Sequence, residues 1–216
     1  MDAIELRRAL GLSRVVIDDR GVTRRGLVST ASLAWDEIVD YRLTAELVGV
    51  NRSVVDVSDV VQAIRIASTA IDAYRGRDRF RFGIALGSDT RRLGFGGGFR
   101  HAELAVAMIL NRVCPPLGRR ARAAFEQAGV GQFGPLALAD DGIGWAGKPP
   151  LPRAHVDAID LFDSSPVRLR VMARGKAFPY ASVRLAQIPN LVAALDLARA
   201  LGYRVRGRPL LAAIGV

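Results

Sequence analysis

The sequence contains few of the residues that build metal centres, disulfides and redox sites. Among 216 residues there is one cysteine, Cys114, and there are two histidines, His101 and His155. One cysteine allows neither a disulfide within the chain nor a cluster of thiolate ligands, and the histidines are too far apart for an HExxH motif. Cys114 precedes two prolines, where we expect a buried, unreactive thiol. We therefore predict no metal and no other cofactor.

Long apolar runs are also missing from the sequence. No stretch approaches the roughly 18 uninterrupted apolar residues of a membrane-spanning helix. The first ten residues mix Asp2, Glu5, Arg7 and Arg8 into their apolar residues, and this differs from the basic-then-apolar order of a secretory signal. We therefore predict a cytoplasmic protein, with attachment to a membrane surface as the alternative location.

Lysine is nearly missing, although the chain is strongly basic. Only Lys148 and Lys176 are lysines, so 29 of the 31 basic residues are arginine (31 minus 2), and the formal net charge is +10. Such a charge attracts nucleic acid or acidic membrane. Aromatic residues make up only 6% of the chain, and no helix-turn-helix or base-stacking motif accompanies the arginines. Charge alone therefore leaves the class of anionic partner open.

The main organising feature is the stretch at residues 15–43, which returns in shortened form at residues 136–161. In both copies an apolar run reaches an aspartate pair and a glycine, DDRG at 18–21 and DDG at 140–142. Aspartate and glycine favour tight turns between strands. We interpret the two stretches as copies of one β-meander.

The two copies continue in the same order. Residues 79–86 and 167–173 alternate as half-buried strands do, and each is followed by a turn and a return strand. Amphipathic helices are predicted from residue 103, ending at Pro115-Pro116, and from residue 191.

Three further segments are predicted around the copies. Residues 2–10 have roughly helical apolar spacing and predict a short lead-in helix. Residues 117–130 predict a basic connecting helix that ends at Gly129. The basic, then apolar, tail from residue 202 either docks as an extra strand or stays loose.

Residues 45–75 have no counterpart in the second copy and are predicted to be an insertion. Their apolar side chains recur with a helical period, and Gly76 follows as a helix stop. Such a helix packs on its own domain or presents its apolar face to a partner. The candidate partner-binding residues are Val57, Val61, Ile64 and Ile71.

Antiparallel strands with Asp-Gly turns, a Trp-Asp-Glu-Ile step at residues 35–38 and one closing helix resemble the bacterial PH-like (pleckstrin-homology-like) domains. The resemblance covers most of residues 15–113 and 136–201. The second copy departs from it, since Arg153 stands at the position of Trp35 and only about five strands are recognisable. A PH-like barrel has seven. The alternative is an ordinary α+β protein in which the similarity between the two stretches arises by chance.

The predicted fold class is α+β, with two PH-like antiparallel β-meander or partial-barrel domains. Each domain is closed by a C-terminal helix, and the first carries a helical insertion at about residues 45–76. We predict the first domain at residues 1–116, a helical connector at 117–133, and the second domain with its basic tail at 134–216.

Three groups of arginines are the candidate anion-binding residues. Where relatives of the PH-like family bind phosphoinositides, basic residues on the first hairpin hold the phosphates, but here Asp18 and Asp19 offset the charge. The other two groups lie in the predicted connector and in the tail, where arginines can bind phosphates with salt-dependent affinity. The nine candidates are Arg20, Arg24, Arg25, Arg119, Arg120, Arg122, Arg204, Arg206 and Arg208.

Signals for enzymatic chemistry are sparse. Residues 94–99, GFGGGF, precede a helix, and such a turn can bind phosphate through backbone amides. The Walker lysine is missing, and the third glycine of a dinucleotide fingerprint falls at Phe99. The adjacent carboxylates at 36–37 point to opposite faces of a strand. An enzyme would need His101 or His155 next to carboxylates in a cleft.

The sequence therefore predicts a non-enzymatic scaffold or interaction module that binds a protein or peptide partner. The expected peptide site is the groove between a last strand and its closing helix, or an exposed strand edge. The alternative is a protein that binds an anionic surface, either acidic membrane or nucleic acid, through its arginines. A small-molecule substrate is not expected.

Overall fold

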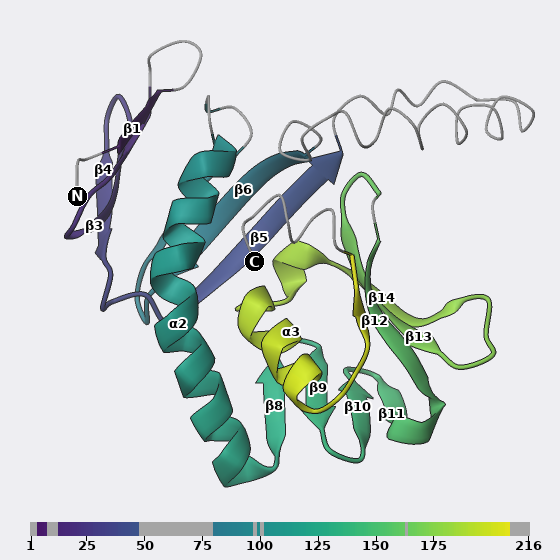
Figure 1. The fold of residues 1–216 in the computed structure, drawn as a ribbon. Coiled ribbons are helices and arrows are strands. Elements are labelled where there is room, and N and C mark those ends of the chain that lie inside the picture. The colour runs from purple at the N-terminus through teal and green to yellow at the C-terminus, as the bar shows by residue number, and fades with distance from the viewer. Residues whose placement is uncertain are drawn as a thin grey trace, which may run out of the picture.

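The structure is a computed structural model that describes residues 4–7, 13–47, 80–96, 99, 102–162 and 164–207, without the side chains of residues 4, 7 and 47. The described chain is α+β, as predicted, with four largely antiparallel sheets and two α-helices (Figure 1). None of these four sheets closes on itself as a barrel.

The first copy consists of a four-stranded sheet, a three-stranded sheet and a long helix. The sheets have the strand orders β1-β2-β3-β4 and β5-β6-β7, and all neighbouring strands are antiparallel. The bounds are β1 Ile4–Arg7, β2 Arg14–Ile17, β3 Gly21–Arg25, β4 Thr30–Ala34, β5 Asp40–Leu47, β6 Phe80–Gly87, β7 Arg92–Phe95 and α2 Ala102–Ala128.

The second copy repeats this order of elements. Its sheets have the strand orders β11-β10-β9-β8 and β14-β13-β12-β15, and β15 alone joins as a parallel strand, next to β12. The bounds are β8 Val130–Phe133, β9 Leu136–Ala139, β10 Gly142–Trp145, β11 Lys148–Pro152, η1 Arg153–His155, β12 Val156–Phe162, β13 Arg168–Ala173, β14 Pro179–Arg184, η2 Leu185–Gln187, α3 Leu191–Ala200 and β15 Val205–Arg206.

The turn glycine has the same role in both copies. A side chain at Gly21 would collide with the carbonyl oxygen of Leu33 on β4, and a side chain at Gly142 would collide with the carbonyl oxygen of Leu151 on β11. Both leucines are buried. The repeated glycine therefore lets two neighbouring strands approach closely at the start of each meander.

Trp35 and Arg153 occupy equivalent positions, as the sequence predicts. The backbone N–H of each donates to the carbonyl of the residue before the turn glycine, at 3.2 Å in the first copy and 2.7 Å in the second. The indole N–H of Trp35 donates to the carbonyl of Asp18 (3.0 Å), and the guanidinium of Arg153 donates to the carbonyl of Asp140 (3.3 Å). Different side chains thus fasten the same hairpin in the two copies.

Helix α2 runs through the proline pair at 115–116, so the predicted helix end there is wrong. A proline inside a helix costs about 3 kcal/mol, but one apolar stripe packs on the core before and after the pair and offsets this cost. The stripe consists of Leu110, Val113, Leu117, Ala121 and Phe125. The predicted end at Gly129 is confirmed, since Gly129 has φ 69° and its N–H donates to the Phe125 carbonyl (2.7 Å).

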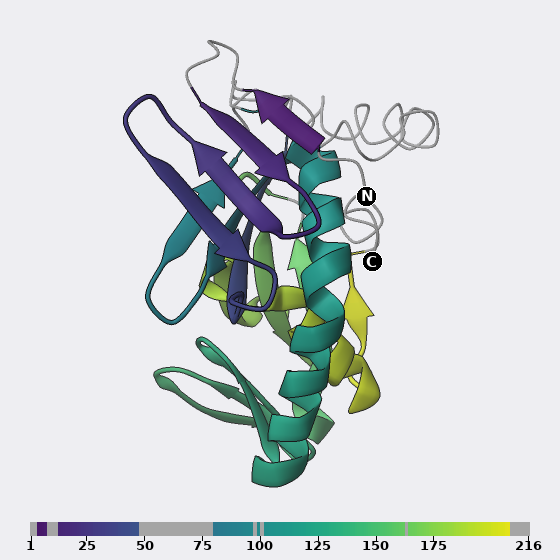
Figure 2. The same cartoon turned by 90° about the vertical axis from the view of Figure 1, so that its left-hand side faces the viewer.

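Because it continues past the prolines, α2 belongs to both copies. Its contacts include β1 and β6 of the first copy and β8 and α3 of the second, and Figures 1 and 2 show it running along both. The buried apolar residues of the two copies form one continuous core. No helix among the described residues has the length and apolar content needed to cross a bilayer.

Two other predicted elements differ from the structure. The predicted helix at residues 2–10 is wrong for residues 4–7, which form β1, where Leu6 is buried opposite Val15 of β2. The second copy has seven meander strands, β8 to β14, where about five were predicted. Strand β11 reads KPPLP, and a sheet accepts proline at an edge strand such as this one. The tail docks in part as the extra strand β15.

The predicted insertion lies mostly outside the described residues. Residues 45–47 belong to β5, and the structure resumes at residue 80. The predicted insertion helix, with Val57, Val61, Ile64 and Ile71, therefore stays a prediction.

Candidate functional site

Hydrogen bonds around Tyr41 join β5 of the first copy to the start of α3 in the second. The N–H of Tyr41 donates to Oδ1 of Asn190 (3.0 Å), and the N–H of Asn190 donates to the Tyr41 carbonyl (2.9 Å). The buried Tyr41 hydroxyl accepts the N–H of Val192 (2.9 Å) and the thiol of Cys114 on α2 (3.5 Å). Asn190 has a left-handed backbone (φ 53°), which asparagine tolerates well. This junction fixes β5, α2 and α3 relative to one another.

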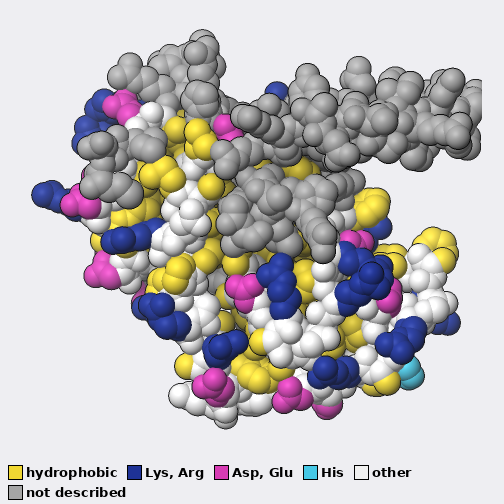
Figure 3. Space-filling model, in the orientation of Figure 1, with side chains coloured by type: hydrophobic (Ala, Val, Ile, Leu, Met, Phe, Trp, Pro, Cys, Tyr) yellow, Lys and Arg dark blue, Asp and Glu magenta, His cyan; other side chains and the backbone are white. Residues whose placement is uncertain are grey.

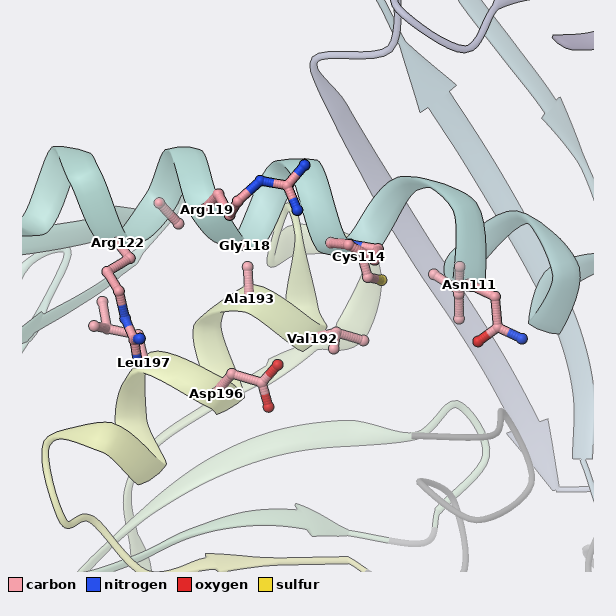
Figure 4. Close-up of a pocket in the computed structure, with 12 residues that line it drawn as sticks. Asn111, Cys114, Gly118, Arg119, Arg122, Val192, Ala193, Asp196 and Leu197 are labelled. Carbon is pink, nitrogen blue, oxygen red and sulfur yellow. The ribbon is translucent and has the colours of Figure 1, made fainter. Parts of the chain in front are cut away.

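A groove of about 420 Å³ lies beside this junction, between α2 and α3. Its floor is apolar and is built by both helices, with Leu110 from α2 and Val192, Ala193 and Leu197 from α3, all buried. Figure 4 shows Cys114 extending from α2 toward α3. The volume lies within the range of about 300–1,000 Å³ that is usual for binding pockets.

Charged side chains form the rim of the groove. Arg119 and Arg122 lie on the α2 side and are exposed, and neither has an ion-pair partner among the described residues. Asp196 lies on the α3 side and pairs with Arg199 (2.7 Å). Figure 4 shows Arg122 extending toward α3, beside Leu197. The α2 wall therefore carries uncompensated positive charge.

The proline pair adds a polar group to this wall. Because proline has no N–H, the carbonyl of Asn111 receives no hydrogen bond from residue 115, its usual helical donor. Asn111 lines the groove and is exposed. Its exposed side-chain amide can therefore form hydrogen bonds with a bound segment.

The thiol of Cys114 is not activated. Burial raises its pKa, the hydrogen bond with Tyr41 offsets part of this shift and the Asp196 carboxylate adds to it, which leaves the pKa at about 11. Burial, and to a lesser extent Cys114, also raise the pKa of the Tyr41 hydroxyl well above its usual value. Both groups are protonated at neutral pH, and a nucleophilic cysteine needs the thiolate. This agrees with the predicted unreactive thiol.

A second hollow, of about 540 Å³, lies against the three-stranded sheet of the first copy. Arg24 and Arg42 line it, and none of the described residues that line it is acidic. The guanidinium of Arg24 donates to the carbonyl of Gly94 (2.8 Å), and that of Arg42 donates to the carbonyl of Ala186 (3.3 Å). Of the predicted phosphate-binding turn, residues 97–98 lie outside the described residues, and Phe99 packs edge-on against Phe95.

The structure distributes the nine candidate arginines over several surfaces. Arg24 lines the second hollow, and Arg119 and Arg122 line the groove. Arg206 pairs with Asp157 (2.9 Å). Figure 3 shows the basic side chains of one face as separate clusters between acidic and apolar ones. The other candidates are Arg20, Arg25, Arg120 and Arg204, which are exposed, and Arg208, which lies outside the described residues.

Among the acidic and histidine candidates, none that the structure describes lies in a catalytic or metal-binding cluster. Asp18 accepts the N–H groups of Arg20 (2.9 Å) and Gly21 (3.0 Å) at the turn, so it is a turn residue as predicted. His155 is exposed in η1, and His101 lies outside the described residues. In the part of the chain that the structure describes, no three His, Cys, Asp or Glu side chains gather as a metal site requires.

The groove between two helices differs from the predicted groove between a strand and a helix. Sequence reasoning missed Asn111 and Asp196 as site residues, because the expected helix end at residue 115 hid the approach of α3 to α2. The signal for them is the apolar stripe that continues at helical spacing beyond the prolines. Comparison with protein-family models and with curated proteins finds no match to this chain.

Proposed function

We propose that the chain is a tandem PH-like protein that acts as a non-enzymatic interaction module. Two observations support the PH-like part of the proposal: each copy has seven meander strands, and a helix follows them in both. The groove between α2 and α3 is the proposed site, because both copies build it and the Tyr41 junction holds its walls in place.

The proposed occupant is a short segment of a protein partner that carries apolar side chains next to carboxylates. The apolar floor gains free energy by burying apolar side chains. Arg119 and Arg122 have donors free to hold carboxylates in paired hydrogen bonds. The side-chain amide of Asn111 can form hydrogen bonds with the segment's backbone. The single observation that carries the proposal is this apolar floor bordered by two arginines that have no ion-pair partner in the described part of the chain.

The same features argue against an enzyme at this groove. Its thiol is protonated at neutral pH, and no histidine is among the described residues that line it. Nucleic acid fits less well, since the floor is apolar and the basic side chains on the face in Figure 3 are scattered. A protein segment satisfies both the apolar floor and the charged rim.

The test is selection from a displayed library of random 12-residue peptides against the purified chain. We expect the enriched peptides to combine Asp or Glu with large apolar residues. Arg122→Glu and Gly118→Trp should each weaken their binding at least about tenfold, because one reverses the wall charge and the other fills the groove. Arg120→Glu makes the same charge change on α2 outside the groove lining and should leave binding unchanged.

Protection of Cys114 gives a second measurement. It is the only cysteine and it lines the groove, so a bound peptide should slow its reaction with a maleimide. Enrichment of basic peptides, equal binding to Gly118→Trp and the original chain, or unprotected Cys114 would each contradict the proposal.

A further inference from the structure

The hairpin between β3 and β4 exposes two large apolar side chains at its tip. Leu27 is 75% exposed and Val28 is 98% exposed. The turn itself is ordered by a hydrogen bond from the N–H of Gly26 to the carbonyl of Ser29 (2.8 Å). Figure 2 shows this hairpin extending away from the rest of the protein. The tip therefore presents adjacent apolar side chains on a defined turn.

This exposure exceeds that of the other large apolar surface residues in the described chain except Phe178, which is a single residue and is 83% exposed. Val39 and Leu104 are 36% and 44% exposed, so each still buries most of its surface. Isolated exposed apolar residues are common in proteins. Leu27 and Val28 lie side by side at the end of a projecting hairpin, where they add little to the stability of the fold. Such a pair of exposed apolar side chains indicates contact with another molecule or with a membrane.

Basic residues flank the tip, and Glu5, the acidic residue that pairs with one of them, lies on another strand, β1. Residues 20–34 contain three arginines and no aspartate or glutamate. Arg25, which is exposed, lies opposite Arg14 on β2, and Arg14 also forms a long ion pair with Glu5 (3.7 Å). The aspartate pair at 18–19 lies at the other end of β3. The apolar tip and the positive charge are thus at the same end of the sheet.

We infer that the β3–β4 hairpin is a membrane-contacting tip that inserts Leu27 and Val28 into the interface of an anionic bilayer. Arg25 and Arg14 then lie at the level of the lipid phosphates, where each basic residue adds to the attraction. A convex apolar tip fits the deformable interface of a bilayer. Nucleic acid would contact the arginines but would not bury the two apolar side chains. This inference is independent of the α2–α3 groove.

Cosedimentation with vesicles tests the inference. We expect the whole chain to bind vesicles of phosphatidylcholine with about 30% phosphatidylserine, and to bind pure phosphatidylcholine much more weakly. The double variant Leu27→Ser/Val28→Ser should lose about tenfold or more in affinity for the anionic vesicles. Leu104→Ser, which changes an exposed apolar residue elsewhere, should bind like the original chain.

Charge and insertion are then measured separately. Arg25→Glu should weaken binding severalfold, whereas Arg120→Glu, the same charge change on α2, should have a smaller effect. For insertion, an environment-sensitive dye is attached to Val28→Cys in a Cys114→Ser background. Its emission should shift to the blue on anionic vesicles, and the same dye on Ala123→Cys should not respond.

Three outcomes would overturn the inference. The first is equal binding of the original chain and the Leu27→Ser/Val28→Ser variant to anionic vesicles. The second is absence of vesicle binding together with duplex DNA or RNA binding that the double variant retains, which assigns the arginines to nucleic acid. The third is a dimer in sedimentation analysis that the double variant dissociates, which assigns the tip to a second copy of the chain.

Discussion

The three-stranded sheet of the first copy, β5-β6-β7, and the corresponding strands β12-β13-β14 of the second copy have the same order but different faces. In the first copy, the face that carries Arg42 and Thr44 has small residues in its middle, at Gly83, Ala85 and Gly94, and a hollow forms over it. In the second copy, the corresponding face carries Arg168, Arg170 and Arg184, with Ser182 and Phe162 beside them.

The arginines of the second copy cover their own sheet. The guanidinium of Arg170 stacks 3.2 Å from the centre of the Phe162 ring, and Arg168 donates to the Ser182 hydroxyl (2.8 Å). Arg168 and Arg170 therefore pack on their own sheet, whereas Arg24 and Arg42 of the first copy, although each donates to a backbone carbonyl, border an open hollow. The same strand order is therefore found with a face covered by arginine side chains and with a face that is hollowed. The side chains on this face, and not the strand order, determine where a ligand can bind.

The largest expected effect tests whether the two hairpins are equivalent. Gly21→Val and Gly142→Val should each lower the free energy of unfolding by about 3 kcal/mol, because each side chain meets a backbone carbonyl that has little room to move. Urea unfolding measures this. Gly118→Ala is the control: nothing lies within 4 Å of the added methyl group, and the helix should gain up to about 1 kcal/mol. If only one valine variant is destabilised, the hairpins are not equivalent.

The second prediction concerns Cys114, which belongs to the first copy but faces the second. With its pKa near 11, it should react with iodoacetamide at pH 8 roughly a hundredfold more slowly in the folded chain than in urea, where an ordinary pKa of about 8.5 applies. A similar rate in both states would mean that the groove leaves the thiol solvated.

The same pKa shift makes stability depend on pH. The raised pKa favours the protonated folded state, so its contribution is fully present below about pH 8.5 and is lost as the pH rises toward about 11. Cys114→Ala should reduce this loss between pH 8.5 and 11 in urea unfolding. An unchanged slope would assign the loss to other groups, Tyr41 first among them.

Tyr41→Phe tests how firmly the copies are joined. It removes the acceptor of the Val192 N–H and should lower the free energy of unfolding by about 1–2 kcal/mol. The variant should still unfold in one transition, because α2 continues to hold both copies. Two separate transitions in differential scanning calorimetry would mean that the Tyr41 hydroxyl is the main link between the copies.

The smallest effect belongs to the covered face of the second copy. Phe162→Ala removes the stacking of Arg170 and should lower the free energy of unfolding by about 0.5–1 kcal/mol. Phe178→Ala, at a residue that is 83% exposed, should leave it unchanged. Equal effects of the two variants would show that the arginine layer adds nothing to stability.

The sequence predicted those parts of the fold in which local pattern and tertiary packing agree. The Asp-Gly turns, strands β2, β6 and β13, and helix α3 follow directly from alternation, turn residues and helical spacing. It failed where packing overrides local preference. The prolines at 115–116 suggest a helix end, but the buried stripe from Leu110 to Phe125 holds the helix together across them.

The groove was less predictable than the fold. Arg119 and Arg122 were recognised as basic, but their placement in one groove with Asp196 depends on the junction between Tyr41 and Asn190, which lie 149 positions apart. No local pattern encodes a contact at that separation. The exposed tip at Leu27 and Val28 was also missed, because only the structure shows that β3 ends at Arg25 and leaves both residues in the turn.

The continuity of α2 restricts how this protein can change. A flexible linker between domains accepts insertions of any length, but one residue added to a helix turns everything beyond it by about 100° and moves it by about 1.5 Å. A residue inserted after Leu117 would therefore rotate the second copy away from β5 and break the Tyr41 junction. The shortest insertion that nearly restores the angle is about seven residues, about two full turns, and it displaces the second copy by about 10 Å. The number of residues in α2 is thus as strictly determined as the identity of a residue in the core.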